Sequence, residues 1–197
     1  MSLFTIVLIT LLAMLVFWAV GAYNRLVRLK NTIANAFGQI DVQLKRRYDL
    51  IPNLVEAAKK YLQHEQATLE AVIAARNQAR SASDAVRSRP AKAEGVVALA
   101  AAEQALGTSL GHLFALAESY PELKADQTIR ELSEELTSTE NKVGFARQAY
   151  NDAVLDYNNA QGQFPALLIA RLFNFAPSAM LQSTESAAER QTLRIQM

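Results

Sequence analysis

Histidine, the side chain best suited to proton transfer and metal binding near neutral pH, occurs only at positions 64 and 112. A di-iron site in a helical bundle needs Glu-x-x-His on two helices, but Tyr61 and Ser109 precede the histidines by three. The sequence also has no HExxH motif, no Ser/His/Asp set and no glycine-rich phosphate loop. Because cysteine is absent, thiolate chemistry, disulfides and zinc–thiolate sites are excluded. We therefore expect no enzymatic activity, cofactor or metal, and both histidines as surface or boundary residues. A hydrolase or metalloenzyme is the least favoured alternative.

The densest charge in the chain is the basic run Lys45, Arg46 and Arg47. On a helix, these side chains could lie on a solvated face, pair with carboxylates of a neighbouring helix, or contact lipid headgroups. The lipid interpretation is the weakest, since Arg46 lies some 24 residues beyond the apolar N-terminal run, about 36 Å along a straight helix. The whole chain has 20 basic and 19 acidic residues, a balance that argues against nucleic-acid binding.

A Tyr-Asn pair occurs three times, at Tyr23-Asn24, Tyr150-Asn151 and Tyr157-Asn158. Tyrosine combines a large apolar ring with a hydroxyl that needs a partner, and asparagine can fix the register of packed helices. Seven residues separate the last two pairs, which places them on one face of a helix. We interpret the pairs as packing and register residues; a partner-binding face is the alternative.

The element that positions all of these residues begins at the N-terminus, where residues 3–22 read LFTIVLITLLAMLVFWAVGA. Twenty residues at 1.5 Å each span about 30 Å, the thickness of the hydrocarbon core of a bilayer. Trp18 and Tyr23 stand near its end, where aromatic rings meet headgroups. We predict a transmembrane anchor over residues 1–24. A cleavable signal peptide is the main alternative, because Ala19-Val20-Gly21 resembles a cleavage site. Against it, a basic n-region is missing. A buried core helix is a second alternative.

The flanks of this segment predict its orientation. Arg25, Arg28 and Lys30 follow it, whereas Met1 and Ser2 precede it. The positive-inside rule then places the N-terminus outside and the large domain in the cytoplasm.

The remainder of the chain predicts an all-α fold, an antiparallel up-and-down bundle over residues 25–164 into which the anchor helix continues. An apolar stripe with helical spacing starts at Leu26 and keeps its phase through Val72, and we expect the helix to reach about Arg80. Pro52 lies within the stripe, so either it kinks one helix or Asp49 caps a new one. Residues 81–95 lack a stripe and predict a surface connection.

The second half predicts two more helices. Leu99 to Ala117 form an apolar stripe that carries Gly107 and Gly111, which either weaken the helix or allow a neighbour to approach closely. Ser119 and Glu122 have capping-box spacing around Pro121. The helix that they open carries a 3.5-residue apolar repeat from Leu132 to Phe164, typical of coiled-coil-like packing.

The C-terminal region, residues 165–197, divides in two. Residues 165–175 read PALLIARLFNF, too short to span a bilayer, and either lie in the membrane interface or close the end of the bundle. From Ser178 onward the chain is polar, and we expect a loose tail.

Six blocks of the sequence stand out: YNRLV at 23–27, QIDVQLKRRYDLIPNLVE at 39–56, Tyr61 with His64-Glu65, YPELKAD at 120–126, TENKVGFARQAYNDAVLDYN at 139–158, and Phe164-Pro165. In these blocks the chain resembles the LemA family of bacterial membrane proteins. The resemblance implies a single-pass protein of the inner membrane with a four-helix bundle, no enzymatic activity and no established catalytic residue. Beside the basic run and the Tyr-Asn pairs, these blocks supply further candidates for structure or interaction: Asp49, Pro52, Asn53, Tyr120, Pro121, Glu140 and Asn141.

Two functional hypotheses follow. The first is a membrane-anchored helical scaffold that self-associates into a homo-oligomer and organises or shapes the membrane. The second is an adaptor or regulator that binds another membrane protein, such as a membrane protease or a sensor. In both, the lipid bilayer is a partner and nucleic acid is not.

Overall fold

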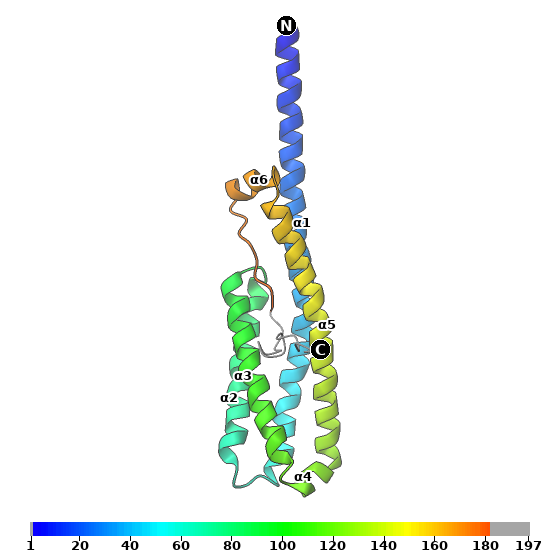
Figure 1. Ribbon diagram of the computed structural model, residues 1–197, viewed down its shortest axis with the longest axis vertical. Helices are drawn as coiled ribbons and strands as arrows, with labels where there is room; N and C mark the ends of the chain where they lie inside the picture. Colours follow the sequence, from blue (N-terminus) through cyan, green and yellow to red (C-terminus); the bar gives the residue numbers. More distant parts are fainter. Residues whose placement is uncertain (1, 182–197) are drawn as a thin grey trace, which may run out of the picture.

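A computed structural model describes residues 2–181 of the chain, and this part is all-helical with no strand. Figure 1 shows a long rod in which the first helix extends well beyond the others. The helices are α1 (Leu3–Lys59), α2 (Gln66–Ser88), α3 (Ala93–Ala117), α4 (Pro121–Ala125), α5 (Gln127–Gly162) and α6 (Ala166–Leu172). The predicted fold class, an N-terminal apolar helix that continues into a helical bundle, is confirmed.

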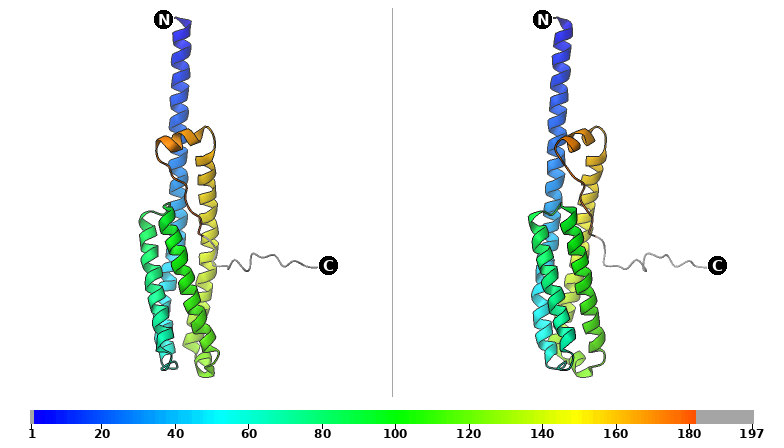
Figure 2. Two further views of the ribbon diagram at one scale, coloured as in Figure 1. Left: turned by 60° about the vertical axis from the view of Figure 1, so that its left-hand side comes forward. Right: turned by 90° about the vertical axis from the view of Figure 1, so that its left-hand side faces the viewer.

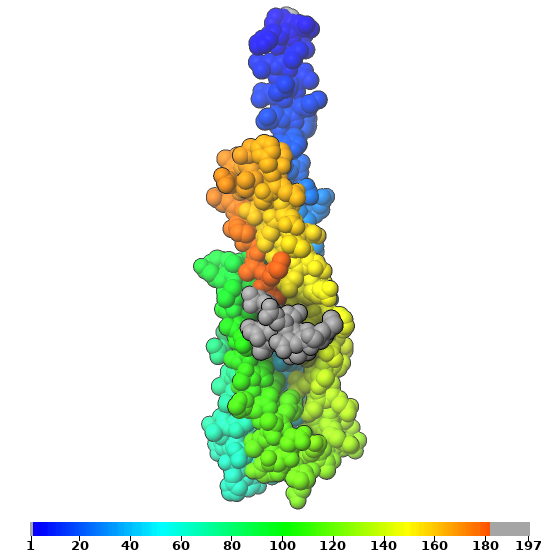
Figure 3. Space-filling model, in the orientation of Figure 1, coloured from blue at the N-terminus to red at the C-terminus, as the bar shows by residue number. Residues whose placement is uncertain are grey.

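The N-terminal part of α1 stands free of the rest of the protein, as the space-filling view shows (Figure 3). It is the one helix in the described region that is long and apolar enough to cross a membrane, and no residue of its most apolar window is buried. Burial starts at Leu26, with 1% of its surface exposed, and continues along one stripe to Ala58. The same helix therefore leaves the uncovered segment and enters the core without a break.

Pro52 lies inside α1, which settles the question that the sequence left open. A proline has no N–H to give to the carbonyl four residues earlier, here that of Tyr48. The Nε–H of Arg76, from α2, donates to this carbonyl at 2.9 Å. A neighbouring helix thus satisfies the orphaned acceptor, and Asp49 is an exposed residue within the helix rather than a cap.

The expectation that the helix containing or following Pro52 continues to about Arg80 is wrong, because α1 ends at Lys59 and the chain reverses over residues 60–65. Glycine and proline, the residues that usually mark a turn, are absent there. Leu62 within the turn is 1% exposed, so the turn itself contributes to the core. The apolar phase persists across the reversal because both helices face the same core.

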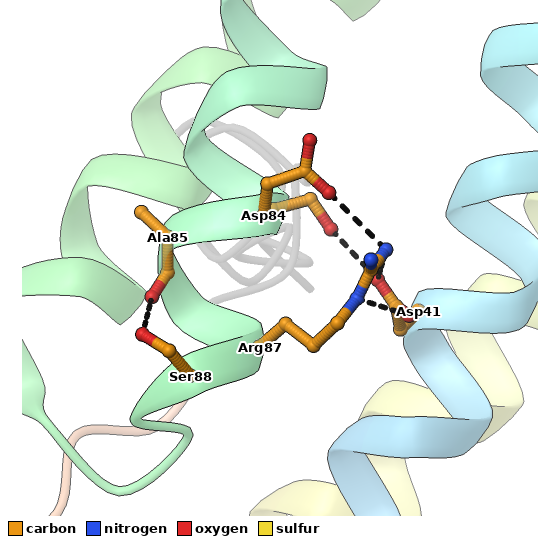
Figure 4. A network of polar contacts seen from close by, with 6 residues as sticks. Asp41, Asp84, Ala85, Arg87 and Ser88 are labelled. Atoms are coloured by element: carbon orange, nitrogen blue, oxygen red, sulfur yellow. Dashed lines mark hydrogen bonds and ion pairs between the residues drawn. The ribbon is translucent and has the colours of Figure 1, made fainter.

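The expected surface connection at residues 81–95 is also wrong for most of its length, because α2 runs to Ser88. Ser83 and Val86 are buried, and Arg87 forms a fork with both carboxylate oxygens of Asp41 on α1, at 2.9 Å each (Figure 4). The buried stripe of α2 continues here through the short side chains of Ala79, Ser83 and Val86, and polar bonds to α1 flank it. Only residues 89–92 connect α2 to α3.

The predicted capping box at Ser119 is not formed. The short helix α4 begins at Pro121 without a side-chain cap, and a separate helix, α5, begins at Gln127. Asp126 is its N-cap: a carboxylate oxygen accepts the N–H of Ile129 at 3.1 Å and the other accepts the hydroxyl of Tyr61 at 2.9 Å. These bonds lower the pKa of Asp126. The repeat from Leu132 lies on α5, whereas Phe164 lies beyond its end and is 80% exposed.

The four long helices pack as an incompletely closed bundle. Helix α1 packs on α5 and on α2, and α2 packs on α3, while α3 and α5 lack comparable contacts among the described residues. Figure 2 shows α2 and α3 as one antiparallel pair beside the longer pair of α1 and α5. One side of the bundle is therefore open.

Helix α6 closes the end of the bundle next to the uncovered part of α1. Its Ile169 and Ala170 are buried with Leu26 of α1 and Ala160 of α5. The chain then runs back along the bundle as an extended segment, residues 175–181, which we call the returning segment (Figure 1). Ser178 and Leu181 are 6% and 5% exposed, so the expectation of a loose tail from Ser178 is wrong up to residue 181; the rest of that tail lies outside the described residues.

Candidate functional site

A buried polar cluster joins three helices in the middle of the bundle. Nη1 of Arg47, on α1, lies 2.7 Å from Oε2 of Glu103 on α3 and 2.8 Å from Oε2 of Glu140 on α5. The hydroxyl of Tyr48 donates to the other oxygen of Glu103 at 2.5 Å. Arg47 and Glu103 are 7% and 5% exposed. One guanidinium thus connects α1 to both walls of the open side.

The electrostatics of the cluster are those of a desolvated ion pair. Burial raises the pKa of Glu103, and the charge of Arg47 together with the hydrogen bond from Tyr48 opposes that rise. Burial and the adjacent carboxylate raise the pKa of Tyr48, so this hydroxyl keeps its proton and remains a donor. Each charged group has an ion-pair partner within the cluster, as burial of charge requires, although Oε2 of Glu140 accepts no hydrogen bond from the described residues. The cluster therefore acts as a polar connection between helices.

The last two Tyr-Asn pairs bind the returning segment. Asn158 accepts the N–H of Ser178 and donates to its carbonyl, both at 2.9 Å, and Asn151 does the same with Leu181, again at 2.9 Å. The amide side chain thus pairs with the backbone as an adjacent strand would. The tyrosine before each asparagine donates to a carbonyl: Tyr157 to Ala176 at 2.9 Å, and Tyr150 to Pro90 at 2.9 Å.

The spacing of the pairs matches the geometry of the segment that they bind. Seven residues of helix rise about 10.5 Å, and three residues of extended chain rise about 10 Å. Asn158 and Asn151 are therefore in register with Ser178 and Leu181, three residues apart. These contacts lie within the chain; the interpretation as register residues and the alternative of a partner-binding face stay predictions.

Replacing Asn158 by Ala should release the returning segment while the helices stay folded. Two backbone groups of Ser178 would lose their partners, which should cost about 1–3 kcal/mol. Limited proteolysis near residue 178 should accelerate, with far-UV circular dichroism unchanged. Asn53→Ala, at an exposed asparagine of α1, is the matched control and should leave the cleavage rate unchanged. Equal cleavage rates for both variants would contradict this role for Asn158.

A groove lies along the open side of the bundle, above the polar cluster. Its main cavity has a volume of about 580 Å³ and is lined by Arg47, Glu103 and Glu140 together with apolar residues of α3 and α5. A second cavity of about 260 Å³ continues towards α4. No three His, Asp or Glu side chains within the described residues are close enough to hold a metal ion. The arrangement is suited to binding a chain segment.

Comparison with protein families matches residues 36–197 to the LemA family. The chain belongs to the LemA family. The match leaves out residues 3–35 of α1, which include its apolar N-terminal part, and it contains the polar cluster and both Tyr-Asn pairs that bind the returning segment. LemA proteins are not a known enzyme family. A comparison with curated proteins gave no match.

The structure of this LemA chain separates the residues of the basic run. Lys45 is exposed, Arg46 pairs with Glu135 of α5, and Arg47 is buried in the cluster. Of the three interpretations, pairing with carboxylates on neighbouring helices holds for the two arginines.

The remaining candidates are dispersed. Tyr23 packs edge-on against Phe173 and Phe175, with ring centroids 4.8 and 5.6 Å apart, so the first Tyr-Asn pair also contacts the region after α6. Tyr120 packs against the core. The others are exposed: Asn24, Asp49, Asn53, Pro121 and Asn141, the last of which lines the groove.

Sequence reasoning missed Glu103, the buried partner of Arg47. Its signal is present: a carboxylate stands among Leu99, Ala102 and Leu106, on the apolar stripe of α3. Glutamate is almost never fully buried without a partner, so a glutamate in an apolar stripe indicates a buried cation nearby. The hydrogen bond from Arg76 to the carbonyl of Tyr48 had no comparable signal in the sequence, because it depends on the acceptor that Pro52 leaves free.

Proposed function

We propose that this LemA protein is a non-enzymatic, membrane-anchored helical scaffold that self-associates into a homo-oligomer at the bacterial inner membrane. The observation that carries the proposal is the unbroken α1, whose uncovered apolar part continues directly into the core of the bundle. An apolar helix without cover in water needs a bilayer or other apolar surfaces around it. Because the anchor and the bundle share one helix, contacts between anchors would fix how neighbouring bundles stand.

The packing of α6 supports an anchor over a cleaved signal peptide. Ala19 and Ala22 pack against the cluster that contains Ile169 and Ala170 of α6. Cleavage after Gly21 would remove part of the surface that α6 covers.

The outer face of α6 supports contact with the bilayer. Leu168 and Leu172 of α6 and the flanking Phe164 and Phe173 are 54–80% exposed. Ile169 and Ala170 of the same helix are buried with Leu26, where α1 enters the bundle. A short apolar face at this level fits the membrane interface. Arg25, Arg28 and Lys30 favour a cytoplasmic bundle with the N-terminus outside. Activity of a periplasm-specific reporter fused to Met197 would contradict that orientation.

Self-association is tested by the mass of the full chain extracted in mild detergent. Native mass spectrometry should show a multiple of the 21.7 kDa protomer, and images of the same particles should show closed symmetry, as most homo-oligomers do. A strictly monomeric particle at all protein concentrations would overturn the scaffold proposal. An adaptor for another membrane protein is the second candidate, favoured by the open groove, and a stoichiometric partner in pull-downs with a monomeric chain would support it.

A further inference from the structure

The open side of the bundle is wide because its α3 wall lacks side chains where a neighbour would pack. Gly107 and Gly111 both line the groove, and a Cβ placed on either would meet nothing within 4 Å. Leu110, Leu136 and Phe114 add apolar surface around them, and Phe114 is 39% exposed. The two glycines therefore leave room for an additional segment that the described residues do not supply.

The returning segment leads to this groove. Leu181, its last residue, packs against Leu99 of α3 and Val143 of α5 around a small gap of about 20 Å³, which Glu103 also lines. Glu103 lines the main cavity as well, so the two spaces share a wall. The extended chain thus reaches residue 181 between the two helices that form the groove.

The length of chain beyond this point suits the groove. Residues 182–197 lie outside the described structure and number 16. From Val143 to Ile129 the α5 wall is about 21 Å long, whereas 16 residues span about 24 Å as a helix and about 53 Å when extended. Residues 182–197 are therefore long enough, as a helix or as an extended chain, to reach the second cavity, near α4, which we call the far cavity.

The composition of those residues also fits the walls. The sequence QSTESAAERQTLRIQM carries apolar side chains at Leu193, Ile195 and Met197, together with two glutamates and two arginines. The walls combine apolar residues with Arg130, Glu134 and other charges of both signs around the far cavity. A segment of mixed charge can pair with both.

We propose that residues 182–197 dock in the groove between α3 and α5 of the same chain, continuing the returning segment. The docked segment would lie against the apolar residues of α3 and α5 that line the groove, next to Arg47, Glu103 and Glu140.

Because the chain has no cysteine, engineered pairs can test the docking in the full-length protein in detergent. The test pair is Thr137→Cys, in the groove, with Thr192→Cys; the control pair is Val42→Cys, on the outer face of α1 and 63% exposed, with Thr192→Cys. A short bismaleimide should cross-link the test pair within one chain and the control pair much less. Equal yields for the two pairs would overturn the proposal.

A mixture of the single variants Thr137→Cys and Thr192→Cys tests whether the C-terminus of a second copy, rather than that of the same chain, occupies the groove. A cross-linked dimer in this mixture, without an intrachain product in the double variant, assigns the groove to the C-terminus of another copy and overturns docking within the chain. This test compares cross-linked products and not the mass of the native particle. Its outcome can therefore be told apart from the outcome of the test for self-association.

A second variant blocks the groove without threatening the fold. Gly107→Leu places a side chain in open space, and leucine favours a helix over glycine. The intrachain cross-link should fall about tenfold, as a loss of about 1.4 kcal/mol in docking free energy would produce. Gly38→Leu, on α1 and also in open space, is the control and should leave the yield unchanged. An undiminished yield in the Gly107 variant would place the segment elsewhere.

Discussion

The Arg47→Met variant is expected to lose about 3–5 kcal/mol of its free energy of unfolding, because it leaves a buried carboxylate without its cation. Glu103 is 5% exposed, and its carboxylate bonds only to Arg47 and Tyr48 among the described residues. The ion pairs from α1 to α3 and to α5 would be lost together. Denaturant titration of the full chain in detergent, followed by circular dichroism, measures the change.

The pH dependence of this loss identifies its cause. Arg47 lowers the pKa of Glu103, so its removal raises that pKa further above the unfolded value of about 4.3. A carboxyl group with a raised pKa in the folded state gives its stabilisation fully below the unfolded pKa and loses it as the pH rises. The deficit of Arg47→Met should therefore be largest near pH 7 and shrink towards pH 4.

The neighbouring arginine provides the matched control. Arg46 pairs with Glu135, but its side chain is 55% exposed. Exposed ion pairs contribute about 0–1 kcal/mol, so Arg46→Met should change stability little. If the two variants lose the same stability, or if the deficit of Arg47→Met does not depend on pH, the cluster is not a desolvated ion pair. Arg47→Met combined with Glu103→Leu should recover much of the loss, since no buried charge is left unpaired on α3.

The sequence predicts the bundle well where apolar spacing decides the structure. The stripe from Leu26 to Ala58 is buried as expected, and so are most positions of the repeat on α5. It fails at the reversal after Lys59, because residues 60–65 contain no residue that breaks a helix and Leu62 continues the phase. Periodicity reports which side of a helix faces the core; it does not report where an apolar turn folds the chain back.

The polar sites were predicted less completely, for a physical reason. Tyr150, Asn151, Tyr157 and Asn158 stand out by type and spacing, yet their partners are backbone groups, those of the returning segment and, for Tyr150, also the carbonyl of Pro90. Any sequence has such groups, so no side-chain pattern in that segment identifies it as the bound chain. A single Arg in the Lys45–Arg47 run is buried because of its angular position on α1, and local composition could not distinguish it from its neighbours.

The Tyr150→Ala variant is expected to lose about 3–5 kcal/mol of its free energy of unfolding, because truncation of a buried aromatic ring leaves a cavity. Tyr150 has no exposed surface, and its ring packs edge-on against Phe37 with centroids 6.2 Å apart. Its hydroxyl donates to the carbonyl of Pro90, between α2 and α3, and lies 3.3 Å from that of Ala179. Denaturant titration of the full chain tests the loss, and a small one would place Tyr150 on a partner-binding face instead.

Tyr150→Phe separates the ring from the hydroxyl. The ring stays, so the cost should be about 1–3 kcal/mol for the buried carbonyl left without a donor. Burial raises the pKa of Tyr150 to about 12, above the value of about 10 in the unfolded chain. A hydroxyl with a raised pKa gives its stabilisation fully below the unfolded pKa and loses it as the pH rises through the folded one. The difference between wild type and Tyr150→Phe should thus be constant below pH 10 and shrink towards pH 12. A loss as large as that of Tyr150→Ala would instead show that the hydroxyl, which joins α5 to the α2–α3 connection, determines how the two helix pairs are held together.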